Sequence, residues 1–162
     1  FFDGVDISSD GLYARHEMGI GYLMQGGRVF PNLTVAENFL IATSHAIQRR
    51  HSKNAVLGSI FPALTGHASD RAGLLSGGQR QMLAIELAIE MTIAQGPVML
   101  LLDEPAGGLT TNLSRHIIRQ ITQKIREFHW GALMVEQNIT IVQEFCDRAL
   151  RLKDGTVEVA PV

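Results

Sequence analysis

Two short strings hold the residues of this chain whose types and spacing suit chemistry. The first, Leu75–Gln81, reads Leu-Ser-Gly-Gly-Gln-Arg-Gln and precedes an apolar, helix-like stretch. Glycines let a backbone approach an anion closely, and a helix N-terminus offers unpaired N–H groups and the positive end of its dipole. With the hydroxyl of Ser76, this string predicts a phosphate-binding turn, although a lone Ser-Gly-Gly more often serves only as a flexible connection.

The second string places two acids directly after the apolar run Val98–Leu102. A run without polar alternation indicates a parallel strand covered on both faces, and α/β proteins bind ligands where such strands end. Asp103 suits Mg²⁺ held directly or through water, and Glu104 suits a base that orients an attacking water. Two acids that merely end a strand in solvent are the alternative for an isolated Asp-Glu.

A phosphate loop of the form G-x-x-x-x-G-K-[ST] does not occur in these residues. The lysines are Lys53, Lys124 and Lys153, and none of them follows a glycine. We therefore expect the chain to carry part of a nucleotide site.

Composition narrows the class of protein. A chain of 162 residues fits one domain with a buried core. The formal net charge of −2 argues against a nucleic-acid partner. The sequence shows neither a signal peptide nor an apolar run long enough to cross a bilayer, which favours a cytoplasmic location.

The elements that must position the two strings alternate between strands and helices, which predicts an α/β fold with a mainly parallel sheet. Thr34 and Glu37 form a capping-box pattern at a helix start, and Asp154-Gly155 is a hairpin signal. The expected strands cover residues 1–7 (broken by Asp3-Gly4), 19–24, 98–102 and 132–135, with a hairpin over 149–152 and 156–159. The expected helices cover 34 onward, 55–64, 79–93, 113–128 (capped by Thr111 or Asn112) and 139–146, and residues 11–17 are expected as a helix or turn.

In this order and spacing, the motifs resemble the nucleotide-binding domain of ABC transporters. Leu75–Gln81 matches the family signature, Met99–Glu104 its Walker B strand, Gln25 its Q-loop glutamine, and residues 106–109 approximate its D-loop. Two stretches, 19–35 and 135–138, are similar to the ATPase subunits of branched-chain amino-acid and urea importers. Gln137 stands where most ABC ATPases carry a histidine, and Glu86 departs from the family pattern after the signature.

The resemblance implies a role for each residue. Glu104 and Gln137 would be catalytic, and Asp103 with Gln25 would bind Mg²⁺. Gln25 would also contact the chain's own ATP, whereas four signature residues would bind the γ-phosphate of ATP held by a second ABC ATPase subunit: Ser76, Gly77, Gly78 and Gln79. Membrane permease subunits would be further partners, with the Arg28–Pro31 loop as one candidate contact, and would place the chain at the inner face of the cell membrane.

The implied fold is a P-loop NTPase-like (ABC ATPase) parallel sheet, formed by a partial domain over residues 1–162 with a helical subdomain at about 34–80. The resemblance begins after the phosphate loop, so we expect an N-terminally truncated domain. The strand of that loop would lie between 132–135 and 149–152. Two open strand edges favour a rearranged sheet or strand-mediated self-association.

The leading hypothesis is the ATP-binding and ATP-hydrolysing subunit of an importer for branched-chain amino acids or a related small solute. We expect these 162 residues alone to be inactive or nearly so as an ATPase, because they contain no Walker A motif. A truncated, non-hydrolysing module that acts through partner binding is the alternative. An ABC-type ATPase of DNA repair or translation is disfavoured by the Q-loop stretch.

Overall fold

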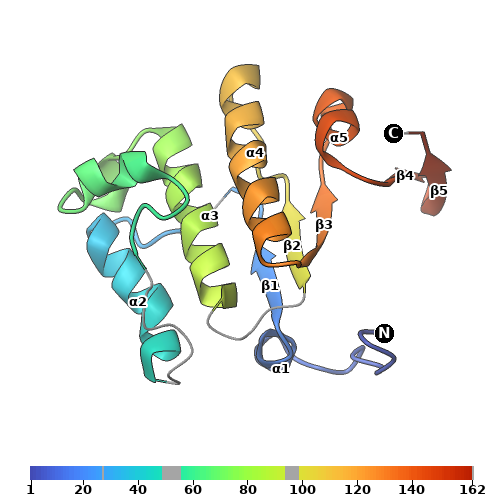
Figure 1. Cartoon of the computed structure of the whole chain (residues 1–162), viewed down its shortest axis with the longest axis horizontal. Coiled ribbons are helices and arrows are strands. Elements are labelled where there is room, and N and C mark those ends of the chain that lie inside the picture. Colours follow the sequence, from blue (N-terminus) through green and yellow to red (C-terminus); the bar gives the residue numbers. More distant parts are fainter. Residues whose placement is uncertain (27, 49–55, 94–98, 162) are drawn as a thin grey trace.

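A three-stranded parallel sheet forms the centre of the molecule (Figure 1). The computed structural model describes residues 1–26, 28–48, 56–93 and 99–161. The sheet order is β1 (Ile20–Leu23), β2 (Met99–Asp103) and β3 (Gly131–Val135), so β2 lies in the middle. The register pairs Leu23 with Leu102, and Leu102 with Met134. This parallel sheet with helices confirms the predicted α/β class.

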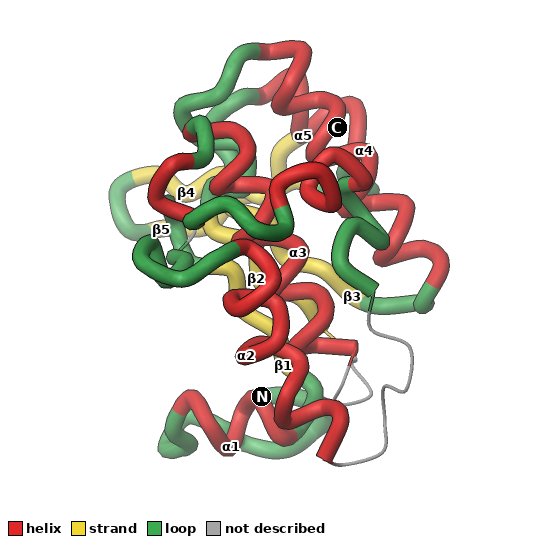
Figure 2. The backbone as a smooth tube through the Cα atoms, turned by 90° about the vertical axis from the view of Figure 1, so that its left-hand side faces the viewer, coloured by secondary structure: helices red, strands yellow, loops and turns green. Residues whose placement is uncertain are grey.

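Five α-helices and two short 3₁₀ helices are found in the described residues. They are α1 (Leu12–Glu17), α2 (Val35–Gln48), η1 (Pro62–His67), η2 (Ala72–Leu74), α3 (Gly77–Ile93), α4 (Thr111–Glu127) and α5 (Ile139–Phe145). The helices α2 and α3 pack against each other on one side of the sheet and lie in front of the strands when viewed from that side (Figure 2). None of the helices is long and apolar enough to cross a membrane, within the residues described.

Helix α2 begins at the predicted capping box. The N–H of Thr34 donates to the Glu37 carboxylate at 2.7 Å, and the N–H of Glu37 donates to the Thr34 hydroxyl at 3.1 Å. The bonds that the Thr34 N–H and the Thr34 hydroxyl donate to the Glu37 carboxylate also hold the pKa of Glu37 below its ordinary value. Two N–H groups at the helix start are thereby paired inside the chain.

Helix α3 contributes most to the core. Leu83, Ile85 and Ile89 are fully buried, as the nearly continuous apolar pattern of this helix predicts. The helix approaches β1 so closely that a Cβ added at Gly21 would lie 2.0 Å from the Thr92 hydroxyl, so only glycine fits there. Leu100 and Leu102 of β2 face the same core.

The other end of the sheet is largely exposed. Within the described residues strand β3 pairs with β2 alone, and four of its five residues are exposed although the strand is apolar. The antiparallel hairpin of β4 (Ala149–Lys153) and β5 (Thr156–Ala160) forms a separate sheet at the C-terminal end (Figure 1). In the part of the chain that the structure describes, strands β3 and β4 belong to separate sheets and are not paired.

Other boundaries differ from the sequence expectations for local reasons. Residues 1–7 form no strand, because Asp3 and Gly4 take positive φ in a tight turn closed by the Phe2–Val5 bridge. Within the predicted helix 55–64, residues 57–60 are turns and bends, and η1 begins only at Pro62, whose ring suits a helix start. The cap of α4 is Thr110, not Thr111 or Asn112. Residue 55, the first of the expected helix 55–64, and residue 98, the first of the expected strand 98–102, lie outside the described residues.

Candidate functional site

Three polar side chains meet where the three parallel strands end. Gln25, Glu104 and Gln137 follow β1, β2 and β3 within one or two residues. The Glu104 carboxylate accepts a hydrogen bond from Gln25 Nε2 at 2.8 Å and one from Gln137 Nε2 at 2.5 Å, through different oxygens. Gln25 lies 79 positions from Glu104 along the chain, and Gln137 lies 33 positions from it. Three predicted site residues that are distant in sequence therefore form one cluster.

The backbone at Glu104 is held in an uncommon conformation. Its φ of 45° lies in the left-handed region, which costs energy for a side chain other than glycine. The Glu104 N–H donates to the Val135 carbonyl at 3.0 Å, which continues the ladder between β2 and β3. The Gly107 N–H donates back to the Glu104 carbonyl at 3.0 Å. These bonds fix the turn that places the carboxylate between the two glutamines.

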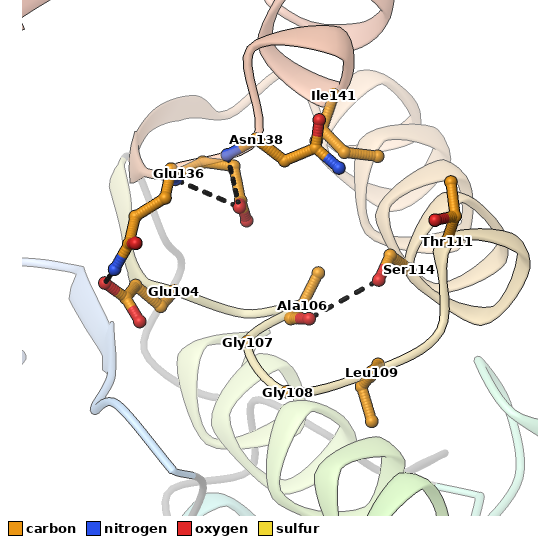
Figure 3. A pocket seen from close by; sticks show the side chains of 11 residues that line it. Glu104, Ala106, Gly107, Gly108, Leu109, Thr111, Ser114, Glu136, Asn138 and Ile141 are labelled. Atoms are coloured by element: carbon orange, nitrogen blue, oxygen red, sulfur yellow. Dashed lines mark hydrogen bonds between the residues drawn. The ribbon is translucent and has the colours of Figure 1, made fainter.

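A cavity of about 270 Å³ lies beside this cluster (Figure 3). Glu104 and Glu136 lie on one side of it, and Thr111 and Ser114 of α4 lie on the other. The Glu136 carboxylate accepts the N–H groups of Gln137 and Asn138 at 3.0 and 3.1 Å. These bonds fix the turn that carries Gln137 toward Glu104.

Oxygen atoms suited to Mg²⁺ remain available at the cluster. Gln25 uses its Nε2 on Glu104, which leaves its amide oxygen free to coordinate, and Asp103 is half-buried at the end of β2. Mg²⁺ commonly binds one or two protein oxygens together with substrate phosphates. No group of three or more histidine, cysteine, aspartate or glutamate side chains that could hold a metal occurs in the described part of the chain. The assignment of Asp103 and Gln25 to a Mg²⁺ ion stays a prediction.

The signature string opens α3 at a second place. The N–H of Ser76 donates to Gln79 Oε1 at 2.9 Å, and the N–H of Gln79 donates to the Ser76 hydroxyl at 3.2 Å. This is a capping box of its own, which the sequence analysis did not identify although the Ser-x-x-Gln spacing carries it. Gly77 begins the helix, and Gly78 lies against α4, where an added Cβ would meet Leu113 at 2.7 Å.

The two places are linked through the body of α3. The buried Gln81 side chain donates from Nε2 to the Pro105 carbonyl at 2.9 Å, one residue after Glu104. No hydrogen bond joins Ser76, Gly77, Gly78 or Gln79 directly to the Glu104 cluster within the described residues. The predicted site residues thus fall into two groups on one scaffold.

Glu86 and its neighbour Glu90 are buried carboxylates whose contacts the sequence did not reveal. Glu86 accepts the N–H groups of Gly58, Ser59 and Phe61, and Glu90 accepts the Ser59 hydroxyl at 2.8 Å. Burial raises the pKa of both carboxyls above the ordinary value. Glu86 therefore holds the turn at 58–61 against α3, which explains its departure from an apolar helix pattern.

A second, mainly apolar cavity of about 360 Å³ lies between β1, α2 and α3. Its lining includes Met24, Phe30, Ile41 and Met91, all of which are exposed, with the charged Arg28 beside them. This groove is separate from both groups of predicted site residues.

Comparison with known proteins identifies the class of protein that this fold and site define. The family model described as ABC transporter matches residues 1–107, about two thirds of the chain. The probable branched-chain amino acid transport ATP-binding protein LivF of Archaeoglobus fulgidus is 35% identical over 97% of this chain and 65% of its own length. The chain belongs to the ABC transporter family.

Of two further relatives, one carries a branched-chain amino acid transport name and the other a lipopolysaccharide export name. The high-affinity branched-chain amino acid transport ATP-binding protein BraG of Pseudomonas aeruginosa is 34% identical over 85% of this chain and 58% of its own. The lipopolysaccharide export system ATP-binding protein LptB of Haemophilus influenzae is 33% identical over 96% and 64%. The chain thus spans between 58% and 65% of the length of these relatives.

Solved structures agree on the fold. A dimeric ATP-binding cassette in a post-hydrolysis state with ADP and Pi superposes with a TM-score of 0.74 at 22% identity, covering 98% of this chain and 72% of that one. A nucleotide-free ATP-binding cassette from an ABC transporter gives a TM-score of 0.73, covering 97% and 66%. At this identity the likeness establishes an ABC ATPase cassette fold and nothing finer.

Proposed function

We propose that this chain belongs to the ATP-binding and ATP-hydrolysing subunit of an ABC-type importer for branched-chain amino acids or a related small solute. The observation that carries the proposal is the Glu104 carboxylate held between Gln25 and Gln137 at the ends of three parallel strands. The names of two relatives support the choice of substrate class. The lipopolysaccharide exporter relative shows that related sequences serve other substrates.

In this proposal Glu104 is the base that orients a water toward the γ-phosphate of ATP. Gln25 and Gln137 keep its carboxylate in place, and Gln137 donates to the γ-phosphate as a neutral group that cannot relay a proton. When bound, Mg²⁺ supplies charge neutralisation on the phosphates, and Asp103 with the Gln25 amide oxygen would hold it. The Ser76–Gln79 turn serves the γ-phosphate bound by a second ABC ATPase subunit.

The test of this function compares two glutamates in the protein that carries this chain, produced with any flanking sequence its gene encodes. Glu104→Gln should lower the rate of Mg-ATP hydrolysis at least about a hundredfold, the low end for loss of a general base, while ATP binding persists. Glu158→Gln on exposed β5 is the matched control and should keep the wild-type rate. Equal rates for the two variants would contradict the role of Glu104.

The printed 162 residues alone should bind Mg-ATP weakly, because they hold no phosphate-loop lysine or backbone cradle. Isothermal titration calorimetry of this polypeptide measures the affinity directly. A micromolar dissociation constant would show that the residues present suffice without that loop.

We further propose a membrane permease as a partner, which would place the protein at the cytoplasmic face of the cell membrane. The apolar groove between β1, α2 and α3 supports this role, because exposed Met24, Phe30 and Met91 with Arg28 at the side suit a mixed apolar and polar segment. The Met91→Glu variant should lose permease in co-purification, whereas the exposed-position control Leu74→Glu should retain it.

A non-hydrolysing module that acts by binding partners is the second candidate. The exposed strands β3, β4 and β5 favour it, since open strand edges pair readily with another chain and support strand-mediated self-association. The helical subdomain at about 34–80 belongs to both candidates. The nucleotide sequence upstream in the gene separates them: an encoded G-x-x-x-x-G-K-[ST] favours the hydrolysing subunit.

A further inference from the structure

A chain of hydrogen bonds leads from η1 to the opening turn of α3. Asp70 Oδ2 lies 2.7 Å from His67 Nδ1, and His67 Nε2 lies 2.8 Å from Gln79 Nε2. The other end of the same amide, Gln79 Oε1, accepts the N–H of Ser76 at 2.9 Å. Four residues that the sequence leaves in separate contexts are thus joined in series.

The two outer members of this hydrogen-bonded series, Asp70 and Ser76, have fixed hydrogen-bonding roles. The backbone N–H of Ser76 can only donate, so the Gln79 amide must turn its oxygen toward Ser76 and its nitrogen toward His67. The ionised Asp70 carboxylate can only accept, so the proton of the ring lies on Nδ1 and Nε2 is the acceptor. The arrangement therefore requires a neutral His67 with its proton on Nδ1.

The segment that carries His67 is itself held to α3 at its other end. Glu86 accepts the N–H groups of Gly58, Ser59 and Phe61, and Phe61 is the residue that immediately precedes η1. Residues 58–67 are consequently fixed to α3 both at Glu86 and, through His67, at Gln79. Both attachment points, Gln79 and Glu86, lie on α3.

We propose that His67 is a positioning residue that, together with the Ser76 N–H, keeps the nitrogen end of the Gln79 amide facing an anion. The amide oxygen is taken by Ser76 and one Nε2 proton by His67, so the second Nε2 proton is the group that remains for a ligand. A γ-phosphate needs a donor at this point, and a reversed amide would oppose it with an oxygen. This inference rests on the proposed function of the Ser76–Gln79 turn.

The bonding itself is tested by nuclear magnetic resonance of the chain labelled with ¹⁵N-histidine. Long-range ¹H–¹⁵N spectra should show His67 with a protonated Nδ1 and an unprotonated Nε2 at neutral pH. Gln79→Leu should shift the Nε2 signal, whereas the control Gln120→Leu on α4 should leave it unchanged. A proton on Nε2, or a ring signal indifferent to Gln79→Leu, would overturn the inference.

The consequence for function is tested by hydrolysis kinetics in the protein as its gene encodes it. His67→Leu should lower kcat about tenfold, the value of one hydrogen bond to a charged group, with little change in KM. His67→Gln should restore most of the rate, because its amide can also donate to Asp70 and accept from Gln79. His116→Leu, at an exposed position of α4, is the control.

The two measurements separate the possible failures. A His67→Leu rate equal to that of His116→Leu, or no recovery in His67→Gln, would overturn the positioning role even if the protein hydrolyses ATP. A wild-type protein without ATP hydrolysis would instead refute the proposed function, and the ring spectra alone would then decide the inference.

Discussion

The helical side of the molecule and its outer strands differ in how far their apolar side chains are buried. On the helical side, formed by α2, η1, η2 and α3, Leu83 and Ile89 are completely buried. On the outer strands β3, β4 and β5, Leu152 is 75% exposed and Val159 is 84% exposed. Exposed apolar side chains gathered on neighbouring strands mark a surface suited to contact with another segment.

Polar groups follow the same division. On the helical side, buried carboxylates and helix starts find partners within the chain, as at Glu86 and in the capping boxes of Thr34 and Ser76. On the outer strands, β3 leaves one edge of backbone groups without a neighbouring strand in the described structure. Buried carboxylates and helix starts on the helical side are thus paired within the chain, whereas the outer strands leave backbone groups and apolar side chains exposed.

The sharpest test of this difference is one substitution made on both sides. Leu83→Ala should lower the free energy of unfolding by about 2–5 kcal/mol, because it leaves a cavity in a close-packed core. Leu152→Ala should change it by less than about 0.5 kcal/mol. Urea unfolding followed by circular dichroism measures both, and similar losses would break the comparison.

The buried carboxylates of α3 give the next largest effect. Glu86→Gln should cost about 1–3 kcal/mol, because an amide nitrogen cannot accept one of the three N–H groups and leaves it unpaired. Glu90→Gln keeps an oxygen for Ser59 and should stay within about 0.5 kcal/mol. Urea unfolding measures the free energy of unfolding of both variants. A larger loss for Glu90→Gln would contradict the role of Glu86 in holding the turn at 58–61.

The same carboxylate predicts a dependence on pH. Burial raises the pKa of Glu86 above 4.5, so the folded chain keeps a proton that the unfolded chain releases. The contribution of Glu86 to the free energy of unfolding is fully present below the pKa of this carboxyl in the unfolded chain. It is lost as pH rises through the pKa of the same carboxyl in the folded chain. The stability gap between wild type and Glu86→Gln should therefore narrow from pH 4.5 toward neutrality. A gap that widens would show that hydrogen bonds to the ionised form outweigh burial.

Helix capping gives a smaller effect. Thr34→Ala should cost about 1 kcal/mol, since the Thr34 hydroxyl pairs the N–H of Glu37. Thr110→Ala, at the start of α4, should cost less because the Thr110 side chain makes no capping hydrogen bond. Thermal unfolding of the two variants compares the caps, and equal losses would mean that the observed bond adds nothing.

The smallest effect on stability is expected at the outer strands, where association should respond instead. Leu133→Lys changes an exposed side chain of β3 and should leave the free energy of unfolding within about 0.5 kcal/mol. A lysine on an open strand opposes pairing with another chain, so oligomers seen by light scattering should decrease. Leu74→Lys, at an exposed position of η2 outside the sheets, is the control. Unchanged association in Leu133→Lys would remove β3 from the contact.

Most elements could be predicted from local patterns. The helices of α2, α3 and α5, the three parallel strands and the hairpin at Asp154-Gly155 follow from periodicity, caps and turn residues, because these signals act over a few neighbouring residues. The helix expected at 55–64 is absent at residues 57–60, and the cause lies in a segment distant in the sequence. The turn at 58–61 is stabilised by Glu86, which lies more than twenty residues later in the chain.

The candidate site was predictable in its members and not in its contacts. The motif order named Gln25, Glu104 and Gln137, and the parallel sheet explains why they meet. Nothing in the spacing of His67 and Asp70 indicated that His67 contacts Gln79, because η1 and α3 come together only in the folded chain. The roles assigned to these residues stay predictions until the variants are measured.

The sequence by itself determined the family, the α/β alternation and the residues that end each strand, since short motifs and periodic patterns depend on the local chain alone. The pairing of side chains in hydrogen bonds, the burial of carboxylates and the exposure of strands follow from the folded arrangement of the elements. Those properties depend on contacts between segments far apart in the chain, where burial removes water and makes each donor and acceptor find a partner.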